Sequence, residues 1–136
     1  MRIETIGLVV CTGLFVALSG CAAMPSKANQ AKIAKFQQTI PTCNSDAECK
    51  AMWDAAQLWI VHNAGYKLQN VTDVLLQTYS PGPYDTDLAV EVTKEPQGHG
   101  IYQIVVRAWC NNLFGCTPNA LDAELDFNVK VGAAKP

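Results

Sequence analysis

The chain has 136 residues, with 10 lysines and arginines against 12 aspartates and glutamates, and a net charge of −2 at pH 7. This length fits a single domain. The mild acidity argues against a nucleic-acid partner, because nucleic-acid-binding proteins need a basic patch.

An apolar run occupies residues 6–18, near the start of the chain. A transmembrane helix needs about 20 consecutive apolar residues, whereas a shorter run is typical of the middle of a signal peptide. Arg2 supplies a positive charge ahead of the run, and the small residues Ser19 and Gly20 end it. We therefore expect residues 1–20 to be a cleaved export signal.

The motif Leu18-Ser19-Gly20-Cys21 resembles the lipobox of bacterial lipoproteins, in which an aliphatic residue and two small residues precede a cysteine. The resemblance covers residues 1–21. It implies that the Cys21 thiol is lipidated, that the chain is cut before Cys21, and that the new amino group is acylated. Ala22 follows, not aspartate, which resembles an outer-membrane address on the periplasmic side. The alternative is an ordinary signal peptide in which Cys21 is incidental.

Residues 21–42 are rich in Ala, Gln and Lys, and we interpret them as a tether between the lipid and the domain. A solvated linker is the favoured form of this tether. The alternative is a short helix over residues 28–38, docked through Ile33 and Phe36.

Four further cysteines, besides Cys21 and the one inside the export signal, form two pairs with the same C-x5-C spacing. An even number of cysteines in a small exported domain predicts disulfides. We expect the local pairs Cys43–Cys49 and Cys110–Cys116, although longer loops would stabilise the fold more. Zinc sites usually have closer cysteine spacing, so we expect no metal and no cofactor.

The domain proper, residues 43–131, begins with the signals of a helix. Ser45 and Glu48 form a capping-box pattern. A stripe with helical spacing follows, consisting of Met52, Ala55, Ala56, Trp59 and Ile60. Gly65 occupies the place of a C-cap glycine. Trp53 lies off the stripe, so it either packs against the tether or is exposed.

Beyond the helix, the apolar pattern changes to a period of two, which is typical of strands. Residues 66–79 are β-rich, but Asp73 interrupts them and predicts a bulge or a split strand. Strands are expected at 88–93 and 101–110. Residues 121–131 alternate throughout and give the clearest strand pattern, with one buried and one wet face as in an antiparallel sheet.

These elements predict an α+β fold. One N-terminal amphipathic helix packs on an antiparallel sheet of about four strands, and two local disulfides staple the domain. Residues 132–136 are a C-terminal tail.

Few residues point to catalysis. The chain has two histidines, His62 near the end of the helix and His99 in a turn. The carboxylates Asp122, Glu124 and Asp126 are expected on one wet strand face, which is usually a solubility stripe. We therefore expect no enzyme. The alternative is a small periplasmic hydrolase or transferase that uses His62 or His99 with a carboxylate.

Two loops carry aromatic and apolar residues. Tyr79 and Tyr84 flank a proline-rich turn, while Trp109, Leu113 and Phe114 lie on or beside the second cysteine loop. Aromatic residues on rigid loops are typical contact anchors, and an ordered loop loses little entropy on binding. Alternatively, Trp109 and Phe114 cap the end of the core.

The sequence thus predicts a small lipid-anchored envelope lipoprotein with a non-catalytic binding or structural role. Its expected partners are the membrane, through the lipid on Cys21, and an unidentified envelope protein. A surface-exposed antigen or inhibitor lipoprotein is a further alternative.

Overall fold

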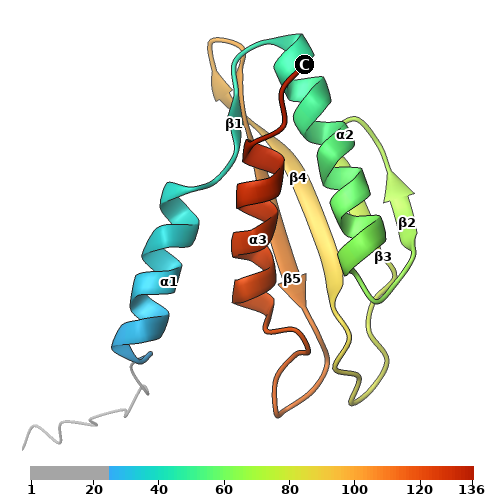
Figure 1. Ribbon diagram of the computed structural model, residues 1–136. Coiled ribbons are helices and arrows are strands. Elements are labelled where there is room, and N and C mark those ends of the chain that lie inside the picture. Colours follow the sequence, from blue (N-terminus) through green and yellow to red (C-terminus); the bar gives the residue numbers. More distant parts are fainter. Residues whose placement is uncertain (1–24) are drawn as a thin grey trace, which may run out of the picture.

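The computed structural model describes residues 25–136 (Figure 1). The predicted export signal and Cys21 lie outside the described residues. The elements follow in the order α1 Lys27–Gln38, β1 Thr42–Cys43, α2 Asp46–Asn63, β2 Leu68–Val71, β3 Leu75–Thr78, β4 Ala89–Gly98, β5 Ile101–Trp109 and α3 Ala120–Gly132. The fold is α+β. Over the described part of the chain, three helices and five strands replace the expected one helix and about four strands.

The strands form one antiparallel sheet in the order β1-β5-β4-β3-β2. Helices α2 and α3 lie side by side on one face of this sheet, and no element of residues 25–136 covers the other, open face (Figure 1). Asp73 falls in the tight turn between β2 and β3, so the predicted split strand is confirmed as a hairpin.

The core lies between the sheet and the two helices. Alternate residues of the central strands point toward the helices, as the pleat requires, and those buried include Leu76, Val90, Val92, Ile104 and Val106. The helices contribute Met52, Ala56, Trp59, Ile60, Phe127 and Val131. The rings of Trp59 and Phe127 meet edge to face, with their centroids 5.2 Å apart.

Helix α2 begins as its capping signal predicts. The Ser45 Oγ accepts a hydrogen bond from the Glu48 backbone N–H at 3.3 Å. The Glu48 carboxylate accepts from the N–H of Asn44, one residue before the cap. Trp53, which was expected to pack against the tether or to be exposed, is instead buried in the core, and its Nε1 donates to the carbonyl of Thr72 at 3.2 Å.

Gly65 is not the left-handed C-cap that the sequence suggested, because Ala64 ends the helix in an extended conformation. A Cβ at Gly65 would lie 2.5 Å from the Cβ of Asp87. The Gly65 N–H also donates to the carbonyl of Leu88 at 2.9 Å. Glycine is therefore needed there for close approach of two chain segments.

The prediction of a strand over residues 121–131 is wrong, because this segment forms helix α3. Its buried residues include Ala123, Phe127 and Val131, which are spaced by four and share one helix face. Val129, which the alternation assigned to the buried face, is exposed. Asn119 caps the helix by accepting from the Asp122 N–H.

Helix α1 occupies part of the predicted tether and packs on α3, so residues 27–38 do not form the solvated linker that was favoured. Phe36 packs against the core, whereas Ile33 stays exposed. The Lys32 ammonium pairs with Asp122. The Asn128 side chain bonds to the carbonyl of Phe36. The earlier residue of α1 thus contacts the earlier residue of α3, and the later contacts the later, so α1 and α3 run parallel.

The two predicted local disulfides are confirmed. Cys43 in β1 joins Cys49 in α2, and Cys110 joins Cys116 in the loop before α3. The first bond is buried and links the sheet edge to the helical layer, whereas the second is half-buried. Within residues 25–136, no helix combines the length and apolarity needed to cross a bilayer.

Candidate functional site

Two loops meet at one end of the domain. Residues 79–88 connect β3 to β4, and residues 110–119 connect β5 to α3. Strands β3 and β5 are both antiparallel to β4, so both end where β4 begins. The two loops therefore leave the sheet at the same end, which is the lower end in Figure 1. We call these two segments together the loop platform.

Hydrogen bonds join the two loops of the platform directly. The Asn112 Nδ2 donates to the carbonyl of Tyr84 at 2.6 Å. Two backbone bonds add to it, from the Asn111 N–H to the Asp85 carbonyl at 3.1 Å and from the Thr117 N–H to the Thr86 carbonyl at 2.9 Å. The platform is consequently one cross-linked unit.

The second loop is also braced internally. The Cys110–Cys116 disulfide closes it. The Asn112 Oδ1 accepts from the Phe114 N–H at 2.9 Å, and Gly115 has a φ of 103°, which suits glycine. The backbone that carries Leu113 and Phe114 is therefore ordered before any partner arrives.

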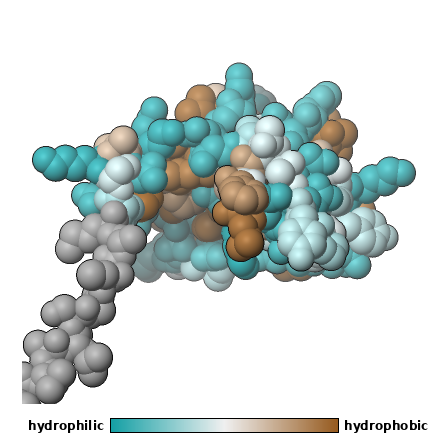
Figure 2. Space-filling view, turned by 90° about the horizontal axis from the view of Figure 1, so that it is seen from below, coloured by the Kyte–Doolittle hydropathy of each residue, from teal (hydrophilic) through white to brown (hydrophobic). Residues whose placement is uncertain are grey.

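The side chains at the platform tip are unusually exposed. The exposed fraction is 80% for Tyr84, 93% for Leu113 and 100% for Phe114. The alternative expectation that Phe114 caps the end of the core is therefore wrong. Figure 2 looks onto this end of the molecule, and brown apolar side chains stand out near the middle of the face. Tyr84 also has a φ of 63°, a costly conformation for a non-glycine residue.

Tyr79 and Trp109, the other predicted contact residues, lie where the strands enter the loops. Tyr79 is 53% exposed, and its N–H donates to the carbonyl of Lys67. Trp109 is half-buried, and the Arg107 guanidinium lies 5.1 Å from its ring centroid. Because Ala108 between them is buried, Arg107 and Trp109 point to the open face of the sheet. The structure therefore separates Trp109 from the tip.

Asp85 anchors the first loop of the platform. Its carboxylate accepts hydrogen bonds from the Tyr66 hydroxyl and from the Asp87 backbone N–H. The bond to Tyr66 lowers the pKa of Asp85 below its usual range and raises the pKa of Tyr66 to about 12. The charged carboxylate and the neutral phenol are thus the forms that hold the loop.

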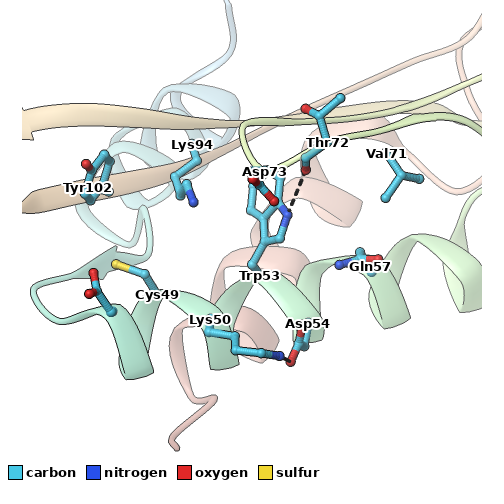
Figure 3. A pocket seen from close by; sticks show the side chains of 11 residues that line it. Cys49, Lys50, Trp53, Asp54, Gln57, Val71, Thr72, Asp73, Lys94 and Tyr102 are labelled. Carbon is cyan, nitrogen blue, oxygen red and sulfur yellow. Dashed lines mark hydrogen bonds and ion pairs between the residues drawn. The ribbon is translucent and has the colours of Figure 1, made fainter.

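A cleft, which we call the aromatic cleft, lies between α2 and the β2–β3 turn (Figure 3). It has a volume of about 530 Å³. The Lys94 ammonium lies 5.6 Å from the Trp53 ring centroid and 5.7 Å from that of Tyr102. Both distances fit cation–π contacts.

The charges around the aromatic cleft are mixed. Lys50 pairs with Asp54 at 2.6 Å on its rim. Asp46 and Asp73 add carboxylates, and in the described residues Lys94 makes no ion pair. This mixture offers no concentrated charge of one sign, so the cleft is a weaker candidate site than the loop platform.

The two histidines lie far apart. His99 is at the turn between β4 and β5, and His62 is in the last turn of α2. The start of α2 is bonded to β1, which pairs with β5 near the β4–β5 turn. The histidines therefore lie at opposite ends of the domain. Across residues 25–136, no three His, Cys, Asp or Glu side chains gather as a metal site would require.

The predicted acidic stripe is wrong, because successive helical positions point in different directions. Asp122 pairs with Lys32 on α1, and Asp126 accepts from the Trp59 Nε1 at 2.8 Å. Glu124 turns to the sheet and accepts from the Ala108 N–H at 2.8 Å. Burial raises the pKa of Glu124. Each of these carboxylates thus has its own structural partner.

The chain matches no protein-family model, and it shows no significant similarity to any curated protein or solved structure. Sequence reasoning pointed to both loops of the platform but missed that they bond to each other. It also missed the aromatic cleft, which unites residues from separate elements.

Proposed function

We propose that this protein is a small lipid-anchored lipoprotein of the bacterial cell envelope that acts by binding, with the loop platform as its contact surface. The lipobox-like motif ending at Cys21 supports the anchor. The two disulfides support an oxidising compartment outside the cytoplasm. Ala22 after Cys21 favours the outer membrane, with the domain facing the periplasm.

The complete exposure of Phe114 on a cross-linked loop is the observation that carries the binding role. Moving a phenylalanine or leucine side chain out of water stabilises a complex by about 1.5–3 kcal/mol. The hydrogen bonds and the disulfide have already fixed the backbone that carries Phe114. Little conformational entropy is therefore lost on contact.

The anchor is tested by the intact mass of the protein extracted from its native membrane, with and without reductant and alkylation. We expect a chain that begins at Cys21, is heavier by its acyl groups, and exposes four thiols only after reduction. An unlipidated chain would contradict the proposed anchor, and free thiols before reduction would contradict the oxidising compartment.

The contact role is tested by a photo-reactive amino acid placed at Phe114 in living cells. A matched control carries the same group at Gln97, which is exposed in β4 at the opposite end of the domain. We expect position 114 to form an adduct with its partner, whether lipid or protein, and position 97 to form none. Equal labelling at the two positions would show that the platform is ordinary surface.

A further inference from the structure

We propose that the partner of the loop platform is the lipid bilayer itself, the same membrane that holds the acyl chains of Cys21. The domain would then attach at two points, through the lipid and through the side chains of Leu113 and Phe114. This inference rests on the proposed lipid anchor.

The direction of α1 is the first reason. Lys32 pairs with Asp122 near the start of α3, and the carbonyl of Phe36 accepts from Asn128 further along both helices. The helices are parallel, so α1 begins at the end of the domain where α3 begins. The second loop of the platform leads directly into α3. The start of α1 and the platform therefore share one end, the lower end in Figure 1.

The length of the chain ahead of α1 is the second reason. Cys21 precedes Pro25, the first described residue, by four positions. Four residues span at most about 14 Å even when fully extended. The lipid must therefore enter a bilayer close to the end of the domain from which the platform projects.

The attachment of α1 is the third reason. Phe36 packs against the core, and its carbonyl is bonded to the buried side chain of Asn128 at 3.1 Å. The pair between Lys32 and Asp122 holds the first half of the helix. Because α1 is docked on the domain, the point where the chain enters α1 is fixed relative to the platform.

The chemistry of the tip fits a membrane interface. Leu113 and Phe114 are apolar and exposed, and Tyr84 beside them offers a ring with a polar hydroxyl, which is typical of side chains at the boundary of a bilayer. The loop platform itself carries the carboxylates of Asp85 and Asp87 and no lysine or arginine. Insertion would consequently be driven by the apolar side chains, without attraction to anionic lipid, and screening by salt should not reverse it.

The small size of the tip favours a bilayer over a protein. A stable protein interface buries about 800 Å² on each partner, which two side chains cannot supply. An anchored domain, in contrast, meets its own membrane at a high effective concentration, so that a weak second contact is enough. The aromatic cleft, on the flank of α2, and the open face of the sheet would both remain free.

The test uses the full lipidated protein in vesicles of phosphatidylethanolamine and phosphatidylglycerol, with or without brominated acyl chains. Phe114→Trp places a reporter at the tip, and the full exposure of Phe114 makes a folding defect unexpected. Gln97→Trp is the matched control, about 26 Å along β4 from the platform end. The emission of the parent protein, which has three tryptophans, is subtracted from each.

We expect the tryptophan at position 114 to shift to the blue and to lose most of its emission to brominated lipid, while the one at 97 is unaffected. This quenching should persist at high salt. If the mass shows lipid but position 114 is not quenched, the bilayer contact is wrong and the anchor stands. A protein adduct at 114 without quenching would mean a protein partner instead. Quenching at both positions would overturn the end-on orientation, and absence of lipid would overturn both proposals.

Discussion

The side-chain amide of Asn128 donates to the carbonyl oxygen of Phe36, which lies 92 residues earlier in the chain, at 3.1 Å. The same Nδ2 lies 3.2 Å from the Thr39 hydroxyl oxygen. Asn128 is only 2% exposed and sits beneath the end of α1. This amide therefore joins α1 to the rest of the domain.

Replacing Asn128 should loosen α1. Asn128→Leu removes one of the donors to the Phe36 carbonyl, which keeps the longer bonds from the Thr39 N–H and hydroxyl at 3.2 and 3.3 Å, and should cost about 1 kcal/mol of unfolding free energy. Asn128→Asp should cost about 3 kcal/mol, because it buries a charge that lacks a donor. Denaturant unfolding measures both losses, and hydrogen exchange should accelerate in α1 first. Unchanged exchange in α1 would mean that other contacts hold this helix.

Glu124 should make stability depend on pH. Burial raises its folded pKa above the ordinary value of 4.5, so the folded state binds more protons between these two values. The free energy of unfolding then falls as the pH rises through this window. Glu124→Gln keeps an oxygen for the Ala108 N–H and should abolish this fall.

The matched variant Glu124→Ala separates the hydrogen bond from the charge. It leaves the Ala108 N–H unpaired and should lower stability by about 1–3 kcal/mol at every pH. Unfolding of both variants between pH 4 and pH 8 is the measurement. Parallel profiles for the parent and the Gln variant would show that Glu124 titrates normally.

The two disulfides should contribute unequally. They close loops of the same length, which gives an entropic stabilisation of about 2 kcal/mol each. Cys43 and Cys49 are also buried in the core, so Cys43→Ser/Cys49→Ser should lose more than Cys110→Ser/Cys116→Ser. Denaturant unfolding compares the pairs, and equal losses would argue that only chain entropy matters.

Tyr66 should control the titration of Asp85. Its hydrogen bond lowers the pKa of Asp85, so this contact contributes stability above pH 3.8 that is lost as the pH falls through the lowered pKa. Tyr66→Phe should return the pKa of Asp85 toward 3.8, as followed by carboxyl NMR. Tyr79→Phe is the control and should leave the titration unchanged.

Lys94 should stabilise the domain through its two aromatic neighbours. Lys94→Met keeps an apolar stem but removes the cation, and should cost about 0.5–1 kcal/mol. Lys50→Met breaks an exposed ion pair with Asp54 and should cost about 0.3–0.5 kcal/mol. If Lys94→Met lowers the free energy of unfolding no more than Lys50→Met does, the charge of the Lys94 ammonium does not stabilise the fold.

Local signals in the sequence predicted local features well. The capping pattern at Ser45 and the interruption at Asp73 each act within a few residues, and both have the predicted result. The C-x5-C spacing placed both disulfides, because a bond closes most readily between cysteines that are near along the chain. The part played by the predicted contact residues stays a prediction.

The segment 121–131 shows where local patterns fail. Strict alternation satisfies a period of two, but it also puts Ala123, Phe127 and Val131 at the spacing of a helix face. The capping asparagine at 119 was the signal that distinguishes the two. The platform likewise depends on a bond between Asn112 and Tyr84, 28 residues apart, which no local pattern encodes.

The parallel arrangement of α1 and α3 also decides how the domain would respond to a pull on its anchor. Tension entering at the start of α1 would run along the axis of that helix. The contacts to α3 would then slide past one another together, and would not peel open one at a time. Force applied to such lengthwise contacts is shared among them, so the bond at Asn128 and the pair at Lys32 would yield together.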